Sequence, residues 1–492
     1  MNFTFIDLAV VIIYLLAVVL IGMRFSSAKG SSRNFFFADK EIPWYLIMIS
    51  IVATETSSLT FLSVPGMSYK GDFGFLEIAF GYIIGRTIVA YLILPLYSRG
   101  EYSSVYEWIG ESFGKNTQRS VSSIFLLTRV LGDGVRLYVT SIPIGFILRG
   151  YLGENFSEDS VGLLTLLIIT AATMLYTVFG GFKSVVVTDA FQFVIYIAGG
   201  IFAFWYLLNQ PEMETGLSAA FSSAYLTGKL NVFHGLDGNF FRSPYFFITA
   251  ITGGAFISIG SHGVDQMIAQ RSLACRTEFE GRKALIGSGI IVFLQFILFL
   301  GIGILLYQFY NAAPISQDKV FSKFITEKIP SPVLGLIIAA ILASAMSTLS
   351  STINSLSLTI MVDWRAKSAN AEKALKDSKL LSIFWGLVLF FSSLIPFYLS
   401  SKILEGLLEL GLKISSFTFG PMIALFMLEI FGKKKIHKFV TPKSLIASLF
   451  LGVFTVIAVS YYFQPAFTLV IPMGILLFYA YLVVLRLLRY PR

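Results

Sequence analysis

Seven hydroxyl side chains lie within residues 344–355, where the other residues are apolar apart from one asparagine. Helical spacing would place five of them on one face, namely Ser344, Ser347, Thr348, Ser351 and Ser355. Hydroxyls in apolar helices usually bond to their own backbone or to a neighbouring helix, but this number exceeds what packing requires. Sodium is a hard cation that prefers several oxygen ligands. This face, with carbonyls freed by an unwound helix, therefore suits sodium binding.

Two other segments have the length of a membrane helix but a polar or glycine-rich middle. Residues 50–60 contain Glu55 among hydroxyls, and residues 253–263 contain four glycines. A carboxylate at mid-membrane depth is unfavourable against lipid, so Glu55 should face a cavity or the protein interior. Each segment alone could be a kinked, tightly packed helix. Two such segments at matching positions favour helices that are broken at a transport site.

Charged residues also occur inside apolar stretches. Arg129 and Asp133 are spaced i, i+4, Asp133 and Arg136 are spaced i, i+3, and Glu55 could pair with Arg86. The favoured interpretation is that these residues form a buried charge network that neutralises itself. In the alternative, one arginine remains unpaired and binds a carboxylate in a bidentate manner.

The elements that would carry these residues are transmembrane helices. Of the 492 residues, 56% are hydrophobic and only 13% are charged, whereas a soluble chain has about a quarter charged residues. The net charge of +9 does not indicate a nucleic-acid partner, because the basic residues lie in short loops between apolar runs. Cys275 is the single cysteine, so an intrachain disulfide is excluded. The chain is predicted to be an all-α integral membrane protein.

Thirteen stretches are long and apolar enough to span a bilayer. They are residues 3–24, 43–69, 74–98, 120–148, 160–180, 184–208, 244–270, 284–308, 331–361, 379–400, 403–431, 442–463 and 466–488. With the N-terminus outside, the cytoplasmic loops and the C-terminus hold 25 Lys and Arg, against 8 in the outward loops. This asymmetry predicts a multi-pass membrane protein with its N-terminus outside and its C-terminus inside. The absence of a targeting sequence and the compact length indicate the cytoplasmic membrane of a prokaryote.

The order of the spans predicts an inverted repeat. The two interrupted segments lie five spans apart, and an odd offset reverses the direction of the chain through the membrane. The longest loop, residues 209–243, is too short for a soluble catalytic domain. The sequence contains no Walker motif, no paired Cys/His metal spacing and no Gly-x-Ser-x-Gly. The chain is therefore not expected to be an enzyme.

Several stretches, in the same order, resemble the sodium:solute symporter family. The most specific is a Gly-Gly turn followed by Thr-Asp-x-x-Gln, and the others are an aromatic entry to the second span, an Asp-Gln and Gln-Arg signature, a serine-rich helix and a Gly-Pro pair. The Gly-Gly stretch occupies residues 177–192, the aromatic entry 35–44, the Asp-Gln and Gln-Arg signature 265–271, the serine-rich helix 347–355 and the Gly-Pro pair 420–421.

This resemblance implies the leucine-transporter architecture, an inverted repeat of five plus five helices. The implied domains are an extra N-terminal helix at residues 1–24, a first repeat at 43–208, a second repeat at 244–431, and two C-terminal helices at 442–488.

The resemblance also implies two ion sites. By position, sodium would be bound by the carbonyls of Ala53, Thr56 and Ser344 and by the hydroxyls of Ser347 and Thr348. Asp189, with Ser350 and Ser351 nearby, matches a carboxylate that some members use for a second sodium and others use for gating. The alternative for Asp189 is an N-cap after the Gly-Gly turn, a role that Thr188 would also suit.

Substrate candidates follow in the same way, and they are Thr54, Glu55, Ser57, Thr60, Ser258, Ser261 and Arg136. Glu55 departs from the family, which has a neutral residue at that position. Ser261 stands where sugar carriers have an aromatic gate, and Gln295 stands where they have a basic residue. The residues at positions 261 and 295 therefore both argue against a simple sugar. Arg136 resembles the third-helix arginine with which sialic-acid carriers of this family hold a carboxylate.

We therefore expect a sodium-coupled symporter that imports a small solute by alternating access, with sodium as the co-transported ion. The solute would be an organic carboxylate such as a sialic acid or a monocarboxylate. Alternatives are a neutral or zwitterionic solute such as an amino acid or vitamin, or a proton-coupled or channel-like member of the same fold. A sensor is disfavoured because the chain ends a few residues after its last span. The expected partners are the solute, sodium and the bilayer, and the oligomeric state stays open.

Overall fold

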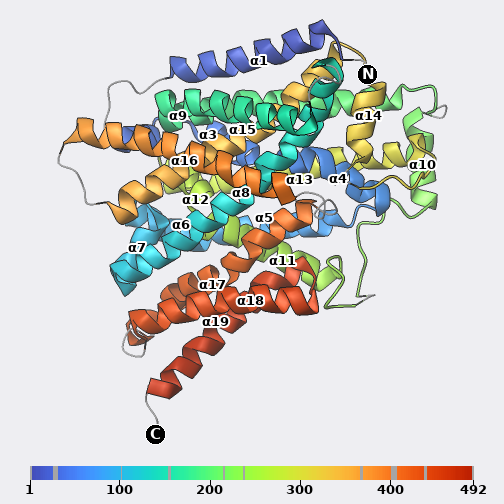
Figure 1. The fold of residues 1–492 in the computed structure, drawn as a ribbon. Coiled ribbons are helices and arrows are strands. Elements are labelled where there is room, and N and C mark those ends of the chain that lie inside the picture. Colours follow the sequence, from blue (N-terminus) through green and yellow to red (C-terminus); the bar gives the residue numbers. More distant parts are fainter. Residues whose placement is uncertain are drawn as a thin grey trace.

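The structure is a computed structural model that describes residues 3–25, 32–100, 102–152, 157–213, 216–236, 239–317, 319–365, 370–399, 407–436 and 440–489. Within these residues every regular element is a helix, as expected for an all-α membrane protein (Figure 1). The elements are α1 (Phe5–Arg24), α2 (Ser32–Phe37), η1 (Ala38–Lys40), α3 (Trp44–Glu55), α4 (Ser58–Lys70), α5 (Phe75–Ile88), η2 (Val89–Ile93), α6 (Leu94–Arg99), α7 (Val105–Phe113), α8 (Lys115–Leu152), α9 (Glu158–Leu208), α10 (Gly216–Leu226), α11 (Phe247–Ile259), η3 (Gly260–Val264), α12 (Gln266–Leu273), α13 (Glu278–Phe309), α14 (Val320–Lys328), α15 (Val333–Thr359), η4 (Ile360–Trp364), α16 (Ala371–Leu399), α17 (Leu407–Ile436), α18 (Pro442–Phe463) and α19 (Phe467–Arg489).

The described residues contain 10 helices that are long and apolar enough to cross a membrane, or 11 if the bent pair α3 and α4 is counted as one span. The sequence predicted thirteen. The difference arises from two helices. The 51-residue α9 is counted once although it is kinked, and α8 is not counted as a candidate span. All the remaining predicted spans overlap one of these candidates each.

The helix α3 ends inside the hydroxyl-rich segment, where the sequence predicted a break. Thr56 and Ser57 both have extended backbone conformations, and α4 starts again at Ser58 at an angle of 66° to α3. Both residues are buried, so this irregular backbone lies within the protein and away from lipid. The break frees the last carbonyls of α3 for partners other than its own backbone.

The second interrupted segment breaks later than its glycines suggested. The chain continues helically through Gly253 and Gly254, becomes a π-helix in η3, and turns extended only at Asp265. A Cβ at Gly254 would collide with the backbone of Ile78 on α5, and one at Gly253 would collide with Thr468 on α19. These two glycines therefore allow close packing of neighbouring helices, and the expectation that they unwind their own helix is wrong.

The long helix α9 is divided by Gly181, whose φ of +61° is accessible mainly to glycine. A side chain there would also approach the carbonyl oxygen of Phe35 and its ring. The two halves of α9 match the two predicted spans at residues 160–180 and 184–208. Within its described residues, the long loop at residues 209–243 contains the short helix α10.

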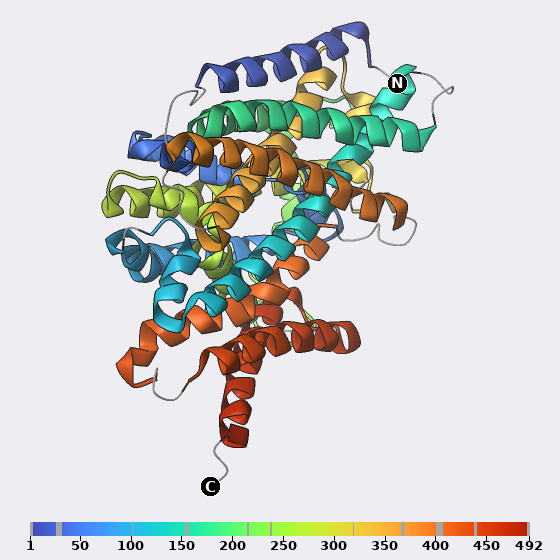
Figure 2. The ribbon, with the colours of Figure 1, turned by 60° about the vertical axis from the view of Figure 1, so that its left-hand side comes forward.

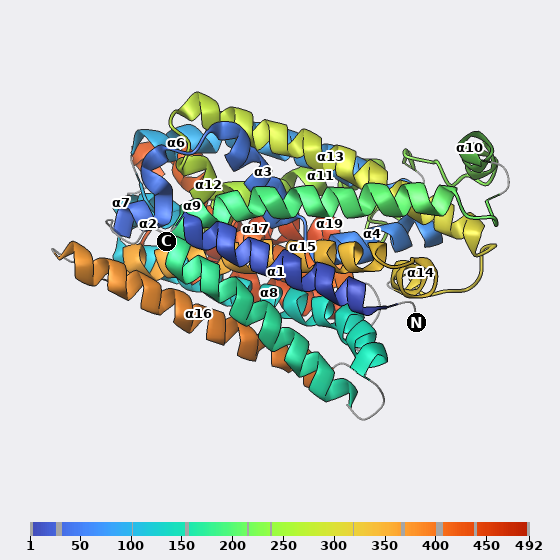
Figure 3. The ribbon, with the colours of Figure 1, turned by 90° about the horizontal axis from the view of Figure 1, so that it is seen from above.

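The extra helices lie at opposite edges of the bundle. Figures 1 and 2 show α1 at one edge and α18 with α19 at the other. The buried carboxylate of Asp7 on α1 accepts a hydrogen bond of 2.7 Å from the backbone N–H of Gly335, near the start of α15. The hydroxyl-rich helix α15 lies in the interior, in contact with α1, α3, α8, α9 and α16 (Figure 3). The bundle therefore surrounds the residues that were expected to bind sodium.

Candidate sodium and substrate site

The broken end of α3 meets the hydroxyl face of α15. The Thr348 hydroxyl lies 3.1 Å from the carbonyl oxygen of Thr54 and 3.1 Å from the carbonyl oxygen of Ser344. The whole segment from Ala339 to Thr359 is buried, so these hydroxyls do not face lipid. This contact places freed α3 carbonyls beside α15 hydroxyls, which is the oxygen-rich environment that sodium prefers.

The five predicted sodium ligands come from these two elements. Ala53 lies on the last turn of α3 and Thr56 at its extended end, while the other three are spaced along the buried face of α15. The Thr56 hydroxyl donates to Gln295 on α13 at 3.0 Å, so its side chain points away from α15. The Ser347 hydroxyl donates to Asp189 at 2.7 Å. Ser344, Ser347 and Thr348 are therefore joined to Asp189, directly or through Thr54, in one connected polar cluster.

Asp189 lies on α9, inside the half that follows Gly181, and it does not cap that helix, so the capping alternative is wrong. Its fully buried carboxylate accepts hydrogen bonds from Ser50 at 2.5 Å, from Ser347 at 2.7 Å and from Arg271 of α12 at 3.0 Å. In the sequence, Arg271 stood out only as part of a motif. In the structure it is the cation that balances Asp189.

The two serines expected near Asp189 differ in their surroundings. Ser351 contacts Arg271 and lies 3.0 Å from the Thr54 hydroxyl, so it belongs to the same cluster. Ser350 instead donates to the carbonyl of Ser347 at 3.0 Å. Ser50, Thr54 and Ser351 join α3 to α15 around the Asp189–Arg271 pair, which closes this region to solvent.

A cavity of about 90 Å³ lies next to this cluster. Five of the predicted substrate residues line it, namely Glu55, Ser57, Thr60, Ser261 and Arg136. The remaining lining residues are Leu59, Phe75, Tyr82, Arg129, Ile257, Phe296, Ser415, Ser416 and Phe419. The cavity therefore combines aromatic walls with a few charged and hydroxyl groups, which is typical of sites for small organic molecules.

Two of the predicted substrate residues do not line this cavity. Thr54 points toward Asp189 and Ser351. Ser258 is buried beside Gly85 of α5, where a Cβ on the glycine would meet its side chain at 2.7 Å. Both positions lie on helices that border the cavity, but their side chains face helix–helix contacts.

The arginines of α8 differ in how completely they are neutralised. Arg129 was expected to pair with Asp133, but its nearest partner is Asp265, which it contacts through two nitrogens at 2.9 and 2.6 Å. Its distance to Asp133 is 3.7 Å. Arg136 bonds to Asp133 through one nitrogen at 3.0 Å, and its side chain is 20% exposed. Within the described residues, its remaining N–H groups have no protein partner.

Asp133 is also engaged from the other side, since the Thr352 hydroxyl of α15 donates to it at 2.6 Å. Asp133 thus divides its negative charge between Arg136, Thr352 and the more distant Arg129. A cavity of about 10 Å³, which is enough for roughly one water, lies between Arg136, Asp133 and Thr348. It shares the lining residues Arg136 and Ser57 with the larger cavity, and it also touches Thr348, whose hydroxyl is expected to bind sodium.

Glu55 forms the ion pair with Arg86 that the sequence suggested. Arg86 is completely buried and also donates to Ser288 of α13 at 3.0 Å. A buried histidine, His262, lies 3.7 Å from Glu55 and was not predicted. The carboxylate of Glu55 is therefore held by a cation and a histidine, although a quarter of the side chain remains exposed to the cavity.

The chain matches known proteins over most of its length. Residues 35–439 match the profile of the sodium:solute symporter family. The sodium/sialic acid symporter SiaT of Proteus mirabilis is 27% identical over 443 residues, covering 88% of this chain and 86% of that protein. The human sodium/iodide cotransporter is 27% identical over 445 residues, covering 86% of this chain and 66% of that protein.

Among solved structures, the substrate-bound outward-open state of a Na⁺-coupled sialic acid symporter superposes with a TM-score of 0.85. The match covers 99% of both chains at 24% sequence identity, so it establishes the shared fold.

Proposed function

The chain belongs to the sodium:solute symporter family, and we propose that it imports a small carboxylate-bearing solute together with sodium. The observation that carries this proposal is the position of Arg136. Its partly unpaired guanidinium faces a cavity beside the broken end of α3, and it also lines the small cavity that reaches Thr348 on α15. One cavity thus offers a cationic group for an anionic solute directly beside the oxygens for sodium.

For sodium, we propose that the carbonyls of Ala53, Thr56 and Ser344 and the hydroxyls of Ser347 and Thr348 form the first site. The contact between Thr348 and the Thr54 carbonyl supports this, because it brings the two helices together. Neutral oxygens suit a singly charged cation that must later leave. Asp189 would form a second sodium site or a gate, since its carboxylate already contacts Ser347 and Arg271.

For the solute, we propose that Arg136 donates to the carboxylate through the N–H groups that Asp133 does not use. Ser57, Thr60 and Ser261 would bond to the neutral polar groups of the solute, and the aromatic rings of Tyr82 and Phe296 would cover its apolar parts. The two relatives described above are named for anions, sialic acid and iodide, which agrees with a cationic site.

A zwitterionic solute is the second candidate, and Glu55 favours it. Its carboxylate is a quarter exposed and lines the same cavity as Arg136. An ammonium group could therefore approach Glu55 while a carboxylate binds Arg136. The carboxylate alone is preferred because Glu55 is already paired with Arg86 and lies close to His262.

For the architecture, we propose thirteen spans, with α8 and the two halves of α9 each crossing the membrane. Residues 43–208 and 244–431 would form inverted repeats, with residues 1–24 before them and 442–488 after them. The N-terminus would lie outside and the C-terminus in the cytoplasm. The asymmetric distribution of Lys and Arg in the loops supports this orientation.

The mechanism would be alternating access by a symporter, not catalysis by an enzyme. We propose that sodium binds the outward-facing state more tightly than the inward-facing state, and that the contact between α3 and α15 is kept only while the site is open to the outside. Opening toward the cytoplasm would then separate Arg271 of α12 from Asp189 of α9. A negative-inside potential adds about 2.3 kcal/mol per charge per 100 mV to sodium entry.

A thermal-stability screen of the purified protein tests the solute class. Sialic acids, monocarboxylates, amino acids, vitamins and sugars are each added in sodium buffer and in potassium buffer. Binding to the folded state raises the melting temperature, so a ligand is recognised before any transport is measured. The matched variants are Arg136→Gln and, on the same helix, Arg119→Gln, whose exposed side chain lies over Trp364 outside the cavity.

We expect carboxylates to stabilise the wild type and Arg119→Gln in sodium, and to have little effect on Arg136→Gln. Stabilisation by amino acids that is lost in both Arg136→Gln and Glu55→Gln would instead support the zwitterionic solute. Stabilisation by sugars alone, or equal stabilisation of wild type and Arg136→Gln by carboxylates, would contradict the proposed site.

A further inference from the structure

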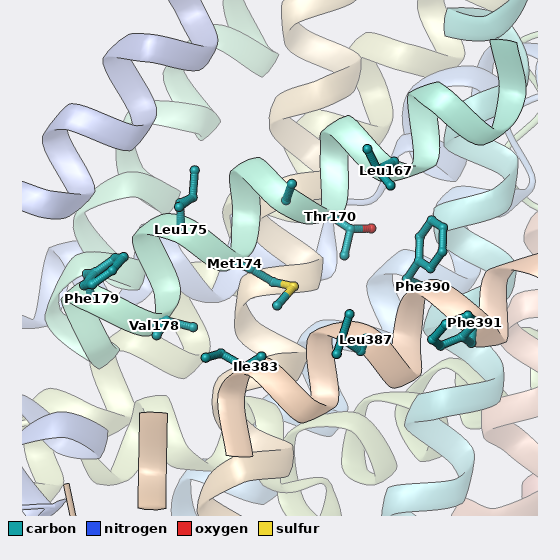
Figure 4. A pocket seen from close by; sticks show the side chains of 11 residues that line it. Leu167, Thr170, Met174, Leu175, Val178, Phe179, Ile383, Leu387, Phe390 and Phe391 are labelled. Atoms are coloured by element: carbon teal, nitrogen blue, oxygen red, sulfur yellow. The ribbon is translucent and has the colours of Figure 1, made fainter. Parts of the chain in front are cut away.

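A third cavity lies on the outside of the bundle, between the first half of α9 and α16. It measures about 520 Å³ and is lined almost only by apolar side chains, including Leu167, Met174, Ile383 and Leu387. Figure 4 shows Met174 of α9 and Leu387 of α16 pointing into the space between the two helices. Its only hydroxyl, on Thr170, donates to the carbonyl of Leu166 at 2.8 Å. We call this feature the α9–α16 groove.

The groove faces the lipid. Leu167, Leu175 and Phe391 line it and are 54%, 48% and 61% exposed, and all three lie within candidate membrane spans. At the groove, Gly386 lets the Met174 side chain pack directly against α16, since a Cβ there would meet the sulfur of Met174 at 2.5 Å. A depression of this size in a membrane-facing surface is filled by hydrocarbon chains or by another protein surface, because water is absent at that depth.

A row of lysines leads into the groove along α16. Lys373, Lys376 and Lys379 follow one another at i, i+3 spacing, on the same helical face as Ile383 and Leu387. Within the described residues, their ammonium groups have no hydrogen bond, ion pair or cation–π contact. The nearby Asp377 is engaged elsewhere, by Arg365 at 2.7 Å. Three lysines without an ion-pair partner among the described residues, beside the single carboxylate of Glu372, therefore stand at one end of an apolar groove.

The dimensions agree with one lipid chain in one leaflet. Along α9 the lining extends from Leu167 to Phe179, a rise of about 18 Å at ~1.5 Å per residue, and on α16 Lys379 lies about one turn before the first lining residue, Ile383. Half of the hydrocarbon core of a bilayer is about 15 Å. The groove thus extends over about the depth of one leaflet, and the lysines lie where the headgroups of that leaflet begin. In the orientation proposed above, this is the cytoplasmic leaflet.

We propose that the α9–α16 groove binds an anionic phospholipid of this leaflet, with one acyl chain in the groove and the phosphate at Lys376 and Lys379. The charge of the lysines selects an anionic headgroup over a zwitterionic one. The apolar lining selects a lipid over a free phosphate. This inference depends on the membrane topology and is independent of the transported solute.

The test uses the full-length protein in detergent, titrated with phosphatidylglycerol or with phosphatidylcholine of the same acyl chains. Retained lipid is counted by native mass spectrometry, and the melting temperature is measured in parallel. The headgroup variant is Lys376→Gln/Lys379→Gln, and its control is Lys115→Gln/Lys443→Gln, two exposed lysines at the starts of α8 and α18. The groove variant is Ala171→Phe, which fills the cavity, and its control is Ala458→Phe, at an exposed position on α18.

We expect phosphatidylglycerol to be retained and to raise the melting temperature more than phosphatidylcholine does. The double lysine variant should weaken its binding about thirty-fold, from the usual contribution of two lysines near an anionic surface. Ala171→Phe should abolish retention, and both controls should behave as the wild type does. Equal effects of the two lipids on the wild type, or unchanged retention in both test variants, would overturn the proposal. A dimer that Ala171→Phe dissociates, without retained lipid, would also overturn it and assign the groove to a second copy.

Discussion

Replacing Thr348 by valine removes one hydroxyl and preserves the shape of the side chain. In the structure this hydroxyl joins the Thr54 carbonyl of the broken α3 to the Ser344 carbonyl of α15. Valine has the same number of heavy atoms, and the site is buried, so the packing of α15 should be retained. The change therefore isolates the oxygen that we propose as a sodium ligand.

The expected magnitude follows from the loss of one oxygen. A hydrogen bond to a charged group contributes about 1.5–3 kcal/mol, and we take one neutral oxygen ligand of sodium to contribute a similar amount. Since about 1.4 kcal/mol corresponds to a factor of ten, the half-saturating sodium concentration should rise about ten- to hundred-fold. The increase in melting temperature at saturating sodium should change little, because the other sodium ligands remain.

The assay is the melting temperature of the purified protein as a function of sodium concentration, with potassium or choline keeping the ionic strength constant. Thr359→Val is the matched control, since Thr359 is also buried on α15 and its hydroxyl has no hydrogen-bond partner among the described residues. We expect Thr359→Val to show the sodium dependence of the wild type. If Thr348→Val keeps that same midpoint, Thr348 is not a sodium ligand and the reasoning is refuted.

Three further outcomes follow from the same geometry. Arg136→Gln should weaken the binding of a carboxylate solute at least ten-fold. Without the solute, the half-saturating sodium concentration of this variant should equal that of the wild type. Titrations of the solute and of sodium, each followed by melting temperature, check these two outcomes. Arg271→Gln should destabilise the fold by about 3–5 kcal/mol, as measured by chemical denaturation, because it leaves Asp189 buried without its cation. Adding Asp189→Asn to the same chain should recover part of that loss, and no recovery would contradict the pairing. Burial raises the pKa of the Cys275 thiol to about 12, so it should resist N-ethylmaleimide at pH 8 in the folded protein and react after unfolding, as followed by mass spectrometry.

Local chemistry was enough to predict several of these features. The hydroxyl run around Thr56 and Ser57 indicated where a membrane helix breaks, because lipid does not tolerate such a segment as a continuous lipid-facing helix. The i, i+4 periodicity of α15 predicted which of its hydroxyls share a face. The Gly-Gly turn likewise separated the two halves of α9. In each case the information lies within a few residues of the chain.

Pairings between distant helices were not predictable in this way. Arg129 has a carboxylate one turn away in Asp133, yet it contacts Asp265, which is far away in the sequence. Asp189 and Arg271 each belong to a recognisable motif, but their mutual contact depends on how α9 and α12 pack. Gly254 was misread for the same reason, since a glycine that serves an adjacent helix looks locally like one that breaks its own.

The most direct measurement is uptake into proteoliposomes under an imposed sodium gradient. The solute is the carboxylate that stabilises the protein most in sodium buffer, given in radiolabelled form, and Arg136→Gln serves as the comparison. We predict that the wild type accumulates the solute above its external concentration only with an inward sodium gradient, and that a sodium ionophore abolishes this accumulation. Equal uptake when potassium or choline replaces sodium would contradict sodium-coupled transport.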